Sequence, residues 1–166
     1  MLASSEFSAT KSRRAKLLVV LMLVVLTLQA SPARSAPLTP PIPGLANYVY
    51  VDLSQQRLTE VHHGAVTATL PVSTGGGYRY TSSDGVNRLA VTPVGRFTIY
   101  RKLPGWQRSY LGSMYYPSYF VGGYSIHGSP SVPRYPVSHG CIRIPMWAAI
   151  GFYQRNPIGT PVFVVR

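Results

Sequence analysis

The segment from Asn47 to Val72 reads NYVYVDLSQQRLTEVHHGAVTATLPV, and its pattern decides the fold class. In two runs within it, residues 48–53 and 57–61, polar and apolar residues alternate along the chain. A short polar turn separates the two runs. Alternation with a period of two, rich in β-branched and aromatic residues, predicts two strands joined as a hairpin. A second turn at His63-Gly64 leads into a further alternating run, residues 65–74. We therefore expect the domain to begin with consecutive strands.

The rest of the chain is also rich in strand formers and poor in helix formers. Fifteen glycines and fifteen prolines in 166 residues interrupt helices too often for a helical bundle. Residues 96–100 and 160–165 predict two more strands, the second of them central in a sheet. Residues 75–87 predict a long glycine-rich loop, and the irregularly spaced tyrosines of residues 104–125 predict loops that cover a sheet. One helix is predicted, at residues 145–154, so the fold class is mainly β.

The length of the chain fits one compact domain with attached segments. Its 166 residues, 46% of them hydrophobic, supply enough apolar material for a single core. Residues 1–36 combine basic residues, a largely apolar run at residues 17–28 and a stretch of small residues, which is the pattern of a secretory signal peptide. The apolar run is too short for a transmembrane helix, which needs about 20 residues. A proline-rich linker at residues 37–45 then precedes a single domain at residues 46–166.

The chain is strongly basic. Its 16 Lys and Arg residues against four Asp and Glu give a net charge of +12, and residues 37–166 alone carry +8. Such an excess favours a polyanionic neighbour, which is nucleic acid, anionic lipid or an acidic cell-wall polymer. Because the signal peptide predicts export, nucleic acid is not an expected partner. Membrane contact is expected only transiently, through the signal peptide.

Cys141 is the only cysteine, although exported proteins usually keep their cysteines in pairs. It lies in Ser138-His139-Gly140-Cys141-Ile142-Arg143, where His139 and Arg143 place two cationisable groups within two residues of the sulfur. A nearby positive charge lowers the pKa of a thiol and favours the reactive thiolate. His127 lies 14 positions upstream, at the end of an expected strand, and the proline-containing loop between them allows the two side chains to meet. A cysteine and a histidine are the minimum for nucleophilic acyl transfer.

Two other interpretations fit the same residues. A single histidine is more often structural than catalytic, and cysteine is among the most buried residue types, so a non-catalytic wall-binding protein with a structural Cys141 is one alternative. A zinc site made by His127, His139 and Cys141 is the other. Its spacing lacks the usual ligand pairs and no carboxylate base lies nearby, so no metal site is predicted.

The sequence resembles a known family at this motif and beyond it. His127-Gly128-Ser129 followed by Ser138-His139-Gly140-Cys141-Ile142-Arg143 resembles the signature of L,D-transpeptidase catalytic domains, the YkuD family of bacterial cell-wall enzymes. Residues 51–58, 71–75 and 92–99 resemble further family segments in family order, so the resemblance covers residues 46–166. It implies β-sandwich-like mixed sheets with one short helix after the catalytic cysteine.

The resemblance also implies a reaction. Cys141 as nucleophile attacks the L-to-D peptide bond before the terminal D-alanine of a tetrapeptide stem, and His127 accepts and returns the proton. A thioester forms, D-alanine leaves, and the amine of a neighbouring stem, often that of diaminopimelate, resolves it. Gly140 and Cys141 are expected to supply oxyanion N–H groups, and Arg143 to contact the donor stem. The substrate and oxyanion site is expected to comprise Ser138, His139, Gly140, Arg143 and Gly128.

The resemblance implies partners and a location as well. The partners are peptidoglycan stem peptides, and neither a metal nor an organic cofactor is expected. The protein is expected to be an exported monomer, in the periplasm or associated with the bacterial cell wall. The nearest enzymatic alternative is an L,D-carboxypeptidase or cysteine peptidase, which forms the same acyl-enzyme but uses water as the acceptor.

Overall fold

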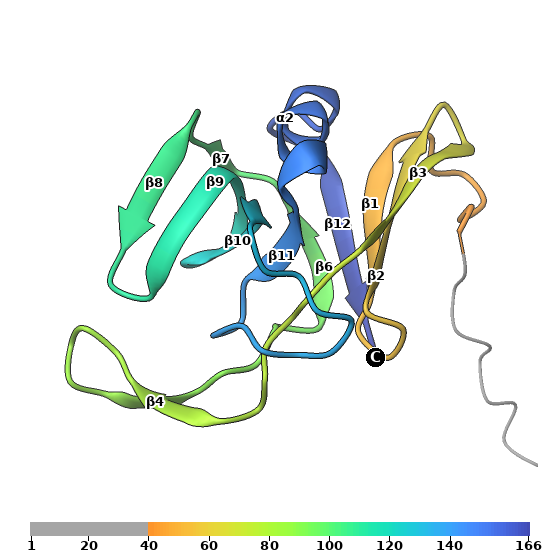
Figure 1. The fold of residues 1–166 in the computed structure, drawn as a ribbon. Helices are drawn as coiled ribbons and strands as arrows, with labels where there is room; N and C mark the ends of the chain where they lie inside the picture. The colour runs from red at the N-terminus through yellow and green to blue at the C-terminus, as the bar shows by residue number, and fades with distance from the viewer. Residues whose placement is uncertain (1–39) are drawn as a thin grey trace, which may run out of the picture. The chain divides into compact units, whose positions relative to one another are not determined.

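The structure is a computed structural model that describes residues 40–166. The predicted signal peptide, residues 1–36, lies outside the described residues, as does the beginning of the predicted linker. No helix among the described residues is long and apolar enough to cross a membrane. The described part forms twelve strands and one helix (Figure 1). In chain order these are β1 (Tyr48–Asp52), β2 (Arg57–His62), β3 (Ala65–Pro71), β4 (Arg79–Thr81), β5 (Asn87–Leu89), β6 (Gly95–Thr98), β7 (Arg101–Lys102), β8 (Trp106–Ser109), β9 (Gly112–Val121), β10 (Tyr124–Ser129), β11 (Ile142–Pro145), α2 (Met146–Arg155) and β12 (Pro161–Val165).

The first sheet contains the strands that the opening segment predicts. Its order is β3-β2-β1-β12-β6, with β1 and β12 parallel and the other neighbours antiparallel. The predicted hairpin is present as β1 and β2, and the C-terminal strand lies inside the sheet as predicted. Both faces of β1 are buried, because its valines enter the main core while Tyr48 and Tyr50 form a second cluster on the other face, against Ile42 and Leu45.

The second sheet carries the residues around Cys141. Its order is β11-β10-β9-β7, and β8 pairs with the first half of β9. β10 and β11 are parallel, and the remaining pairs are antiparallel. The main core joins both sheets and α2 through buried aliphatic and aromatic side chains, among them Val51, Leu58, Val162, Phe120, Ile126, Ile144 and Phe152. These mixed sheets with one short helix confirm the mainly β fold class.

Two segments predicted as loops contain strands, so those predictions are wrong. The glycine-rich segment is a hairpin in which β4 and β5 pair, with Arg79 opposite Leu89. Most of residues 104–125 forms β8, β9 and the start of β10 and does not form covering loops. The tyrosine spacing does not follow the alternation expected of a regular strand. This is because β9 is bulged against β10 and Tyr116 has a φ of 50°. A bulge breaks the alternation of faces on which the sequence pattern depends.

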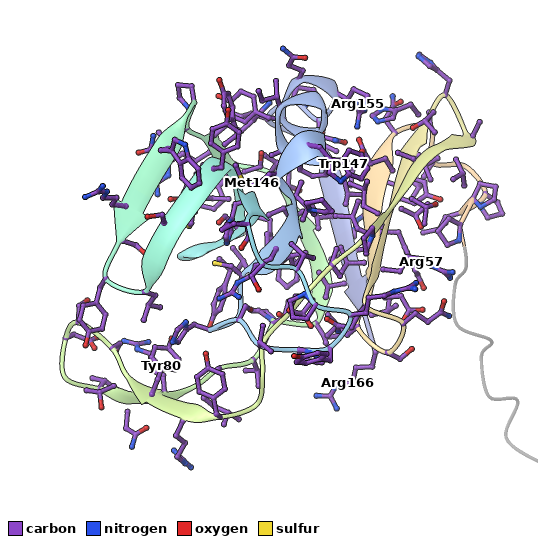
Figure 2. The ribbon with its side chains drawn as sticks, viewed as in Figure 1. Arg57, Tyr80, Met146, Trp147, Arg155 and Arg166 are labelled. Atoms are coloured by element: carbon purple, nitrogen blue, oxygen red, sulfur yellow. The ribbon has the colours of Figure 1, made fainter. Side chains whose placement is uncertain are left out.

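Helix α2 matches the predicted helix to within one residue at each end. Its C-terminal end is tied to the first sheet through a buried carboxylate. Arg155 donates to both oxygens of Glu60 at 3.1 and 2.7 Å, and Asn156 donates to one of them at 2.8 Å. The Glu60 side chain has no exposed surface, so its charge is tolerated only because these donors compensate it. Figure 2 shows Arg155 beside α2, near the first sheet.

Candidate active site

The pairing of β10 with β11 brings the predicted catalytic residues to one face of the second sheet. His127 lies opposite Arg143 in parallel register. Side chains alternate between faces along a strand, so the residues two positions earlier, Ser125 and Cys141, share the face of His127 and Arg143. The isoleucines between them are buried in the main core on the other face. The sheet register therefore fixes which side chains meet at this site.

The imidazole of His127 is held in one orientation. It is 5% exposed, and its Nδ1 lies 2.9 Å from the carbonyl oxygen of Gly128. A carbonyl only accepts hydrogen bonds, so Nδ1 carries the proton and Nε2 keeps its lone pair when the ring is neutral. Burial, together with the charge of Arg143, lowers the pKa of His127 to about 4. The ring is therefore neutral near pH 7 and able to accept a proton at Nε2.

The thiol of Cys141 is protonated near neutral pH, contrary to what the neighbouring residues predict. Its sulfur lies 3.8 Å from Ser125 Oγ and 4.0 Å from the carbonyl oxygen of Gly123. Burial raises the pKa of Cys141, and the lowering effects of the Ser125 hydrogen bonds and of Arg143 do not offset it. The expectation of a preformed thiolate is wrong because desolvation outweighs the nearby positive charge. The pair is therefore a neutral thiol and a neutral imidazole.

The loop before Cys141 is fixed by hydrogen bonds and by one glycine. Ser138 Oγ donates to the Cys141 carbonyl at 2.6 Å and accepts from the Gly140 N–H at 2.9 Å. The Gly140 N–H, expected in the oxyanion site, is thus engaged within the loop. Gly140 has a φ of +128°, and a Cβ there would lie 2.4 Å from the Tyr124 ring and 2.6 Å from the Val91 carbonyl. Only glycine fits this position without rearrangement.

His139 lies between two tyrosines of the glycine-rich segment. Its ring meets Tyr78 and Tyr80 edge to face, with centroid separations of 5.4 and 4.8 Å. Burial, and then the charge of Arg143, lower the pKa of His139 below its ordinary value. Figure 2 shows Tyr80 on the β4–β5 hairpin. His139 therefore joins that hairpin to the loop that carries Cys141.

Gly128 faces away from the thiol side of the sheet. A Cβ at this position would lie 2.7 Å from the Cβ of Ala149 in α2 and 3.2 Å from the Cβ of Tyr115. Its close approach to the helix explains why no larger residue fits there. The structure gives Gly128 a supporting position, through its carbonyl bond to His127.

A pocket of about 290 Å³ opens onto the sulfur. Cys141, His127, Arg143 and His139 line it, so the structure brings these four predicted residues together. Ser138 does not line this pocket and is 1% exposed. Much of the remaining wall comes from the tips of two hairpins, with residues Ser82, Ser83, Tyr110, Leu111, Gly112 and Ser113, and Ser109, Met114, Tyr119 and Gly123 complete it. No group of three or more His, Cys, Asp or Glu side chains within residues 40–166 is arranged to hold a metal ion.

Sequence reasoning missed Ser125 and both hairpin tips. Ser125 is fully buried and its hydroxyl lies beside the sulfur. Its position two residues before His127 on a strand was the available signal, because residues at i and i+2 share a face. The hairpin tips gave no comparable signal, since their approach to Cys141 depends on the packing of distant parts of the chain.

Comparison with known proteins adds independent findings. The model of the L,D-transpeptidase catalytic domain family, YkuD, matches residues 46–164. A solved L,D-transpeptidase from Xylanimonas cellulosilytica is 39% identical, with a TM-score of 0.68, covering 72% of this chain and 60% of that chain. A cysteine-to-serine mutant of the Enterococcus faecium L,D-transpeptidase is 23% identical, with a TM-score of 0.59, covering 73% and 50%. L,D-transpeptidase 3 from Mycobacterium tuberculosis, solved with a faropenem-derived adduct, is 22% identical, with a TM-score of 0.59, covering 73% and 60%.

These solved structures are longer than the region that matches, since the chain covers half to three fifths of their length. The two that are under 25% identical support the fold alone. A search of curated proteins finds no match.

Proposed function

The chain belongs to the L,D-transpeptidase catalytic domain family, YkuD, and we propose that it is an exported peptidoglycan L,D-transpeptidase with Cys141 as its nucleophile. The observation that carries the proposal is the shared pocket. Cys141 and His127 lie on one sheet face and line one cavity, and His127 is neutral with its Nε2 lone pair available. A nucleophile with an adjacent base that a third group orients is the arrangement for acyl transfer.

The first half-reaction starts from the two neutral groups. As Cys141 Sγ attacks the carbonyl carbon of the L-to-D peptide bond, its proton passes to His127 Nε2. A C–S bond forms, and the oxyanion is stabilised by the Cys141 N–H. The imidazolium then protonates the leaving nitrogen, the C–N bond breaks, and D-alanine departs from a thioester. Because Gly128 accepts from Nδ1, the ring stays in the required orientation throughout.

The second half-reaction reverses these proton transfers. The amine of a neighbouring stem attacks the thioester carbonyl and gives a proton to His127. A C–N bond forms, the C–S bond breaks, and the proton returns to Cys141. Arg143 lines the same pocket and offers its guanidinium to a carboxylate of the donor stem. No metal or organic cofactor takes part in these steps.

Export and the stem-peptide partner are parts of the same proposal. They are supported by the signal-peptide pattern of residues 1–36 and by the net charge of +8 carried by residues 37–166, which favours a neighbourhood of carboxylates and phosphates. The protein is proposed to act as a monomer in the periplasm or at the cell wall. Fractionation of bacteria that express the full chain, with and without residues 1–36, tests the location.

The activity is tested by incubating the protein with a tetrapeptide-stem muropeptide and reading products by mass. A cross-linked dimer and free D-alanine support transfer, whereas a tripeptide product alone supports the carboxypeptidase alternative. The intact mass after exposure to a carbapenem should increase by one adduct. The matched controls are Cys141→Ala, which should form neither product nor adduct, and His127→Ala, which should acylate much more slowly. Full activity of Cys141→Ala would refute Cys141 as the nucleophile, whereas absence of both product and adduct with the unmodified protein would favour a non-catalytic, wall-binding protein in which Cys141 is structural.

A further inference from the structure

The main-chain groups beside the sulfur are engaged in hydrogen bonds, with one exception. The Gly140 N–H donates to Ser138 Oγ, and the Cys141 carbonyl accepts from the same hydroxyl. The Gly140 carbonyl accepts from Thr92 Oγ1 at 2.8 Å. Among residues 40–166, no group accepts a hydrogen bond from the Cys141 N–H. This N–H is therefore the main-chain donor beside the sulfur that stays available to a substrate.

Thr92 determines which way the peptide group between Gly140 and Cys141 faces. A peptide group is planar, and in the trans form its C=O and N–H point in opposite directions. This peptide is trans, and its carbonyl points at Thr92. Thr92 lines a cavity that shares no residue with the pocket at the sulfur. Because the carbonyl is turned away from the catalytic pocket, the Cys141 N–H is turned toward it.

This peptide needs an anchor because a glycine precedes it. Gly140 has no side chain that would restrict rotation about the bond to its carbonyl carbon, and its φ of +128° lies in the region that glycine tolerates. A rotation of the peptide plane would turn the carbonyl toward the pocket and the N–H away from it. The hydrogen bond from Thr92 opposes this rotation, since a buried carbonyl that loses its donor is destabilising.

The Thr92 hydroxyl is arranged to act as a donor. Thr92 is 7% exposed, and its Oγ1 accepts a hydrogen bond from the Gly75 N–H at 2.9 Å. A hydroxyl has a single proton, so the Gly75 donor leaves that proton for the Gly140 carbonyl. Pro93 follows Thr92 in the chain and restricts its backbone to the extended region. Gly75 approaches closely, because a Cβ there would lie 2.6 Å from the Val91 Cα.

We infer that Thr92 is a positioning residue for the acylation step, and that its hydroxyl holds the Cys141 N–H facing the oxyanion. This inference rests on the proposed function, because it concerns the oxyanion of that reaction. Thr92 does not line the catalytic pocket and takes no proton. Loss of its hydroxyl should therefore slow the step in which charge develops on the carbonyl oxygen. Substrate binding should not change, and neither should the reaction of the sulfur with a reagent that forms no oxyanion.

The experiment compares Thr92→Val and Thr92→Ala, which lack the hydroxyl, with Thr92→Ser, which keeps it. D-Alanine release from a tetrapeptide-stem muropeptide gives kcat and KM. In the valine and alanine variants kcat should fall about tenfold to a hundredfold with KM unchanged. Removing an oxyanion donor outright lowers kcat about a hundredfold to a thousandfold, and here the donor is only misaligned. Thr92→Ser should behave like the unmodified protein.

Alkylation of Cys141 by iodoacetamide separates positioning from damage to the loop. This reaction displaces iodide at a saturated carbon and forms no oxyanion, so its rate should be the same in every variant. Thr74→Val is the matched control, because Thr74 is also a buried threonine and its hydroxyl bonds with Gln56, not with the loop that carries Cys141. This control should unfold at lower urea concentration but keep the kcat of the unmodified protein.

The outcomes distinguish this inference from the proposed function. If the unmodified protein releases no D-alanine, the proposed function fails and the inference falls with it. If the unmodified protein is active and the valine and alanine variants keep its kcat, the proposed function stands and the inference alone is wrong. A rise in KM without a fall in kcat, an equal fall in the alkylation rate, or an inactive Thr92→Ser would also overturn the inference. Each of these results would assign Thr92 to the shape of the loop and not to the hydrogen bond of its hydroxyl.

Discussion

The burial of His127 predicts that acid weakens the fold over a defined pH range. Its pKa is lowered from 6.5 to about 4 in the folded protein. Between these values the unfolded chain binds a proton that the folded protein does not, so the free energy of unfolding falls as the pH falls. The loss starts near the unfolded pKa and is complete below the folded one. Linkage gives a loss of about 2 kcal/mol at pH 5 and about 3 kcal/mol at pH 4, relative to pH 8.

The measurement compares the protein with His127→Gln, which keeps a donor for the Gly128 carbonyl but does not titrate. Urea unfolding followed by tryptophan fluorescence at pH 8 and pH 5 gives the free energy of unfolding of both proteins. The difference between the two pH values should be smaller in the variant by about 2 kcal/mol. The pKa of His139 is also lowered, but this residue is present in both proteins, so its contribution to the pH dependence cancels. Equal pH dependence in the two proteins, or an imidazole titration near pH 6.5 by NMR, would refute the reasoning.

Three further changes have expected outcomes. Gly128→Ala should lower the free energy of unfolding by about 1–3 kcal/mol, since its Cβ would overlap a side chain of α2; unchanged urea unfolding would contradict this. Arg155→Leu should lower the free energy of unfolding, measured in urea, by about 2–3 kcal/mol. This is less than the loss for a fully buried ion pair, because Arg155 is half exposed, and adding Glu60→Gln to the same protein should recover part of it. Ser125→Ala removes the side-chain hydrogen bond that helps to lower the pKa of Cys141 and keeps the backbone one, so alkylation by iodoacetamide should move to higher pH, and a shift to lower pH would count against the assignment.

The strands of the first sheet could be predicted from the sequence, because their alternation reflects burial on defined faces. The same approach failed for β9, where Tyr116 adopts a positive φ and a bulge places neighbouring tyrosines out of alternation. The placement of Cys141 and His127 in one pocket could also be predicted, since chemistry and spacing mark both residues, and their catalytic roles stay a prediction. The protonation of the thiol could not, because the sequence shows the nearby charges but not the burial that outweighs them.

The lining of the pocket depends on contacts between distant parts of the chain. Ser82 and Leu111 belong to two different hairpins, and both line the cavity beside the sulfur. Neither residue type nor local pattern marks such positions.

The parallel ladder between β10 and β11 has a consequence for tracing related enzymes. The segment that connects β10 to β11 forms no part of their pairing. Its length therefore does not determine that His127 lies opposite Arg143. Insertions or deletions at residues 130–137, ahead of the hydrogen-bonded loop that carries Cys141, would leave His127 and Cys141 facing the same cavity. A search for related proteins should therefore look for the pairing of His127 with Arg143 across the two strands. A search that demands the 14-position interval between His127 and Cys141 would discard homologues whose connecting segment is longer or shorter.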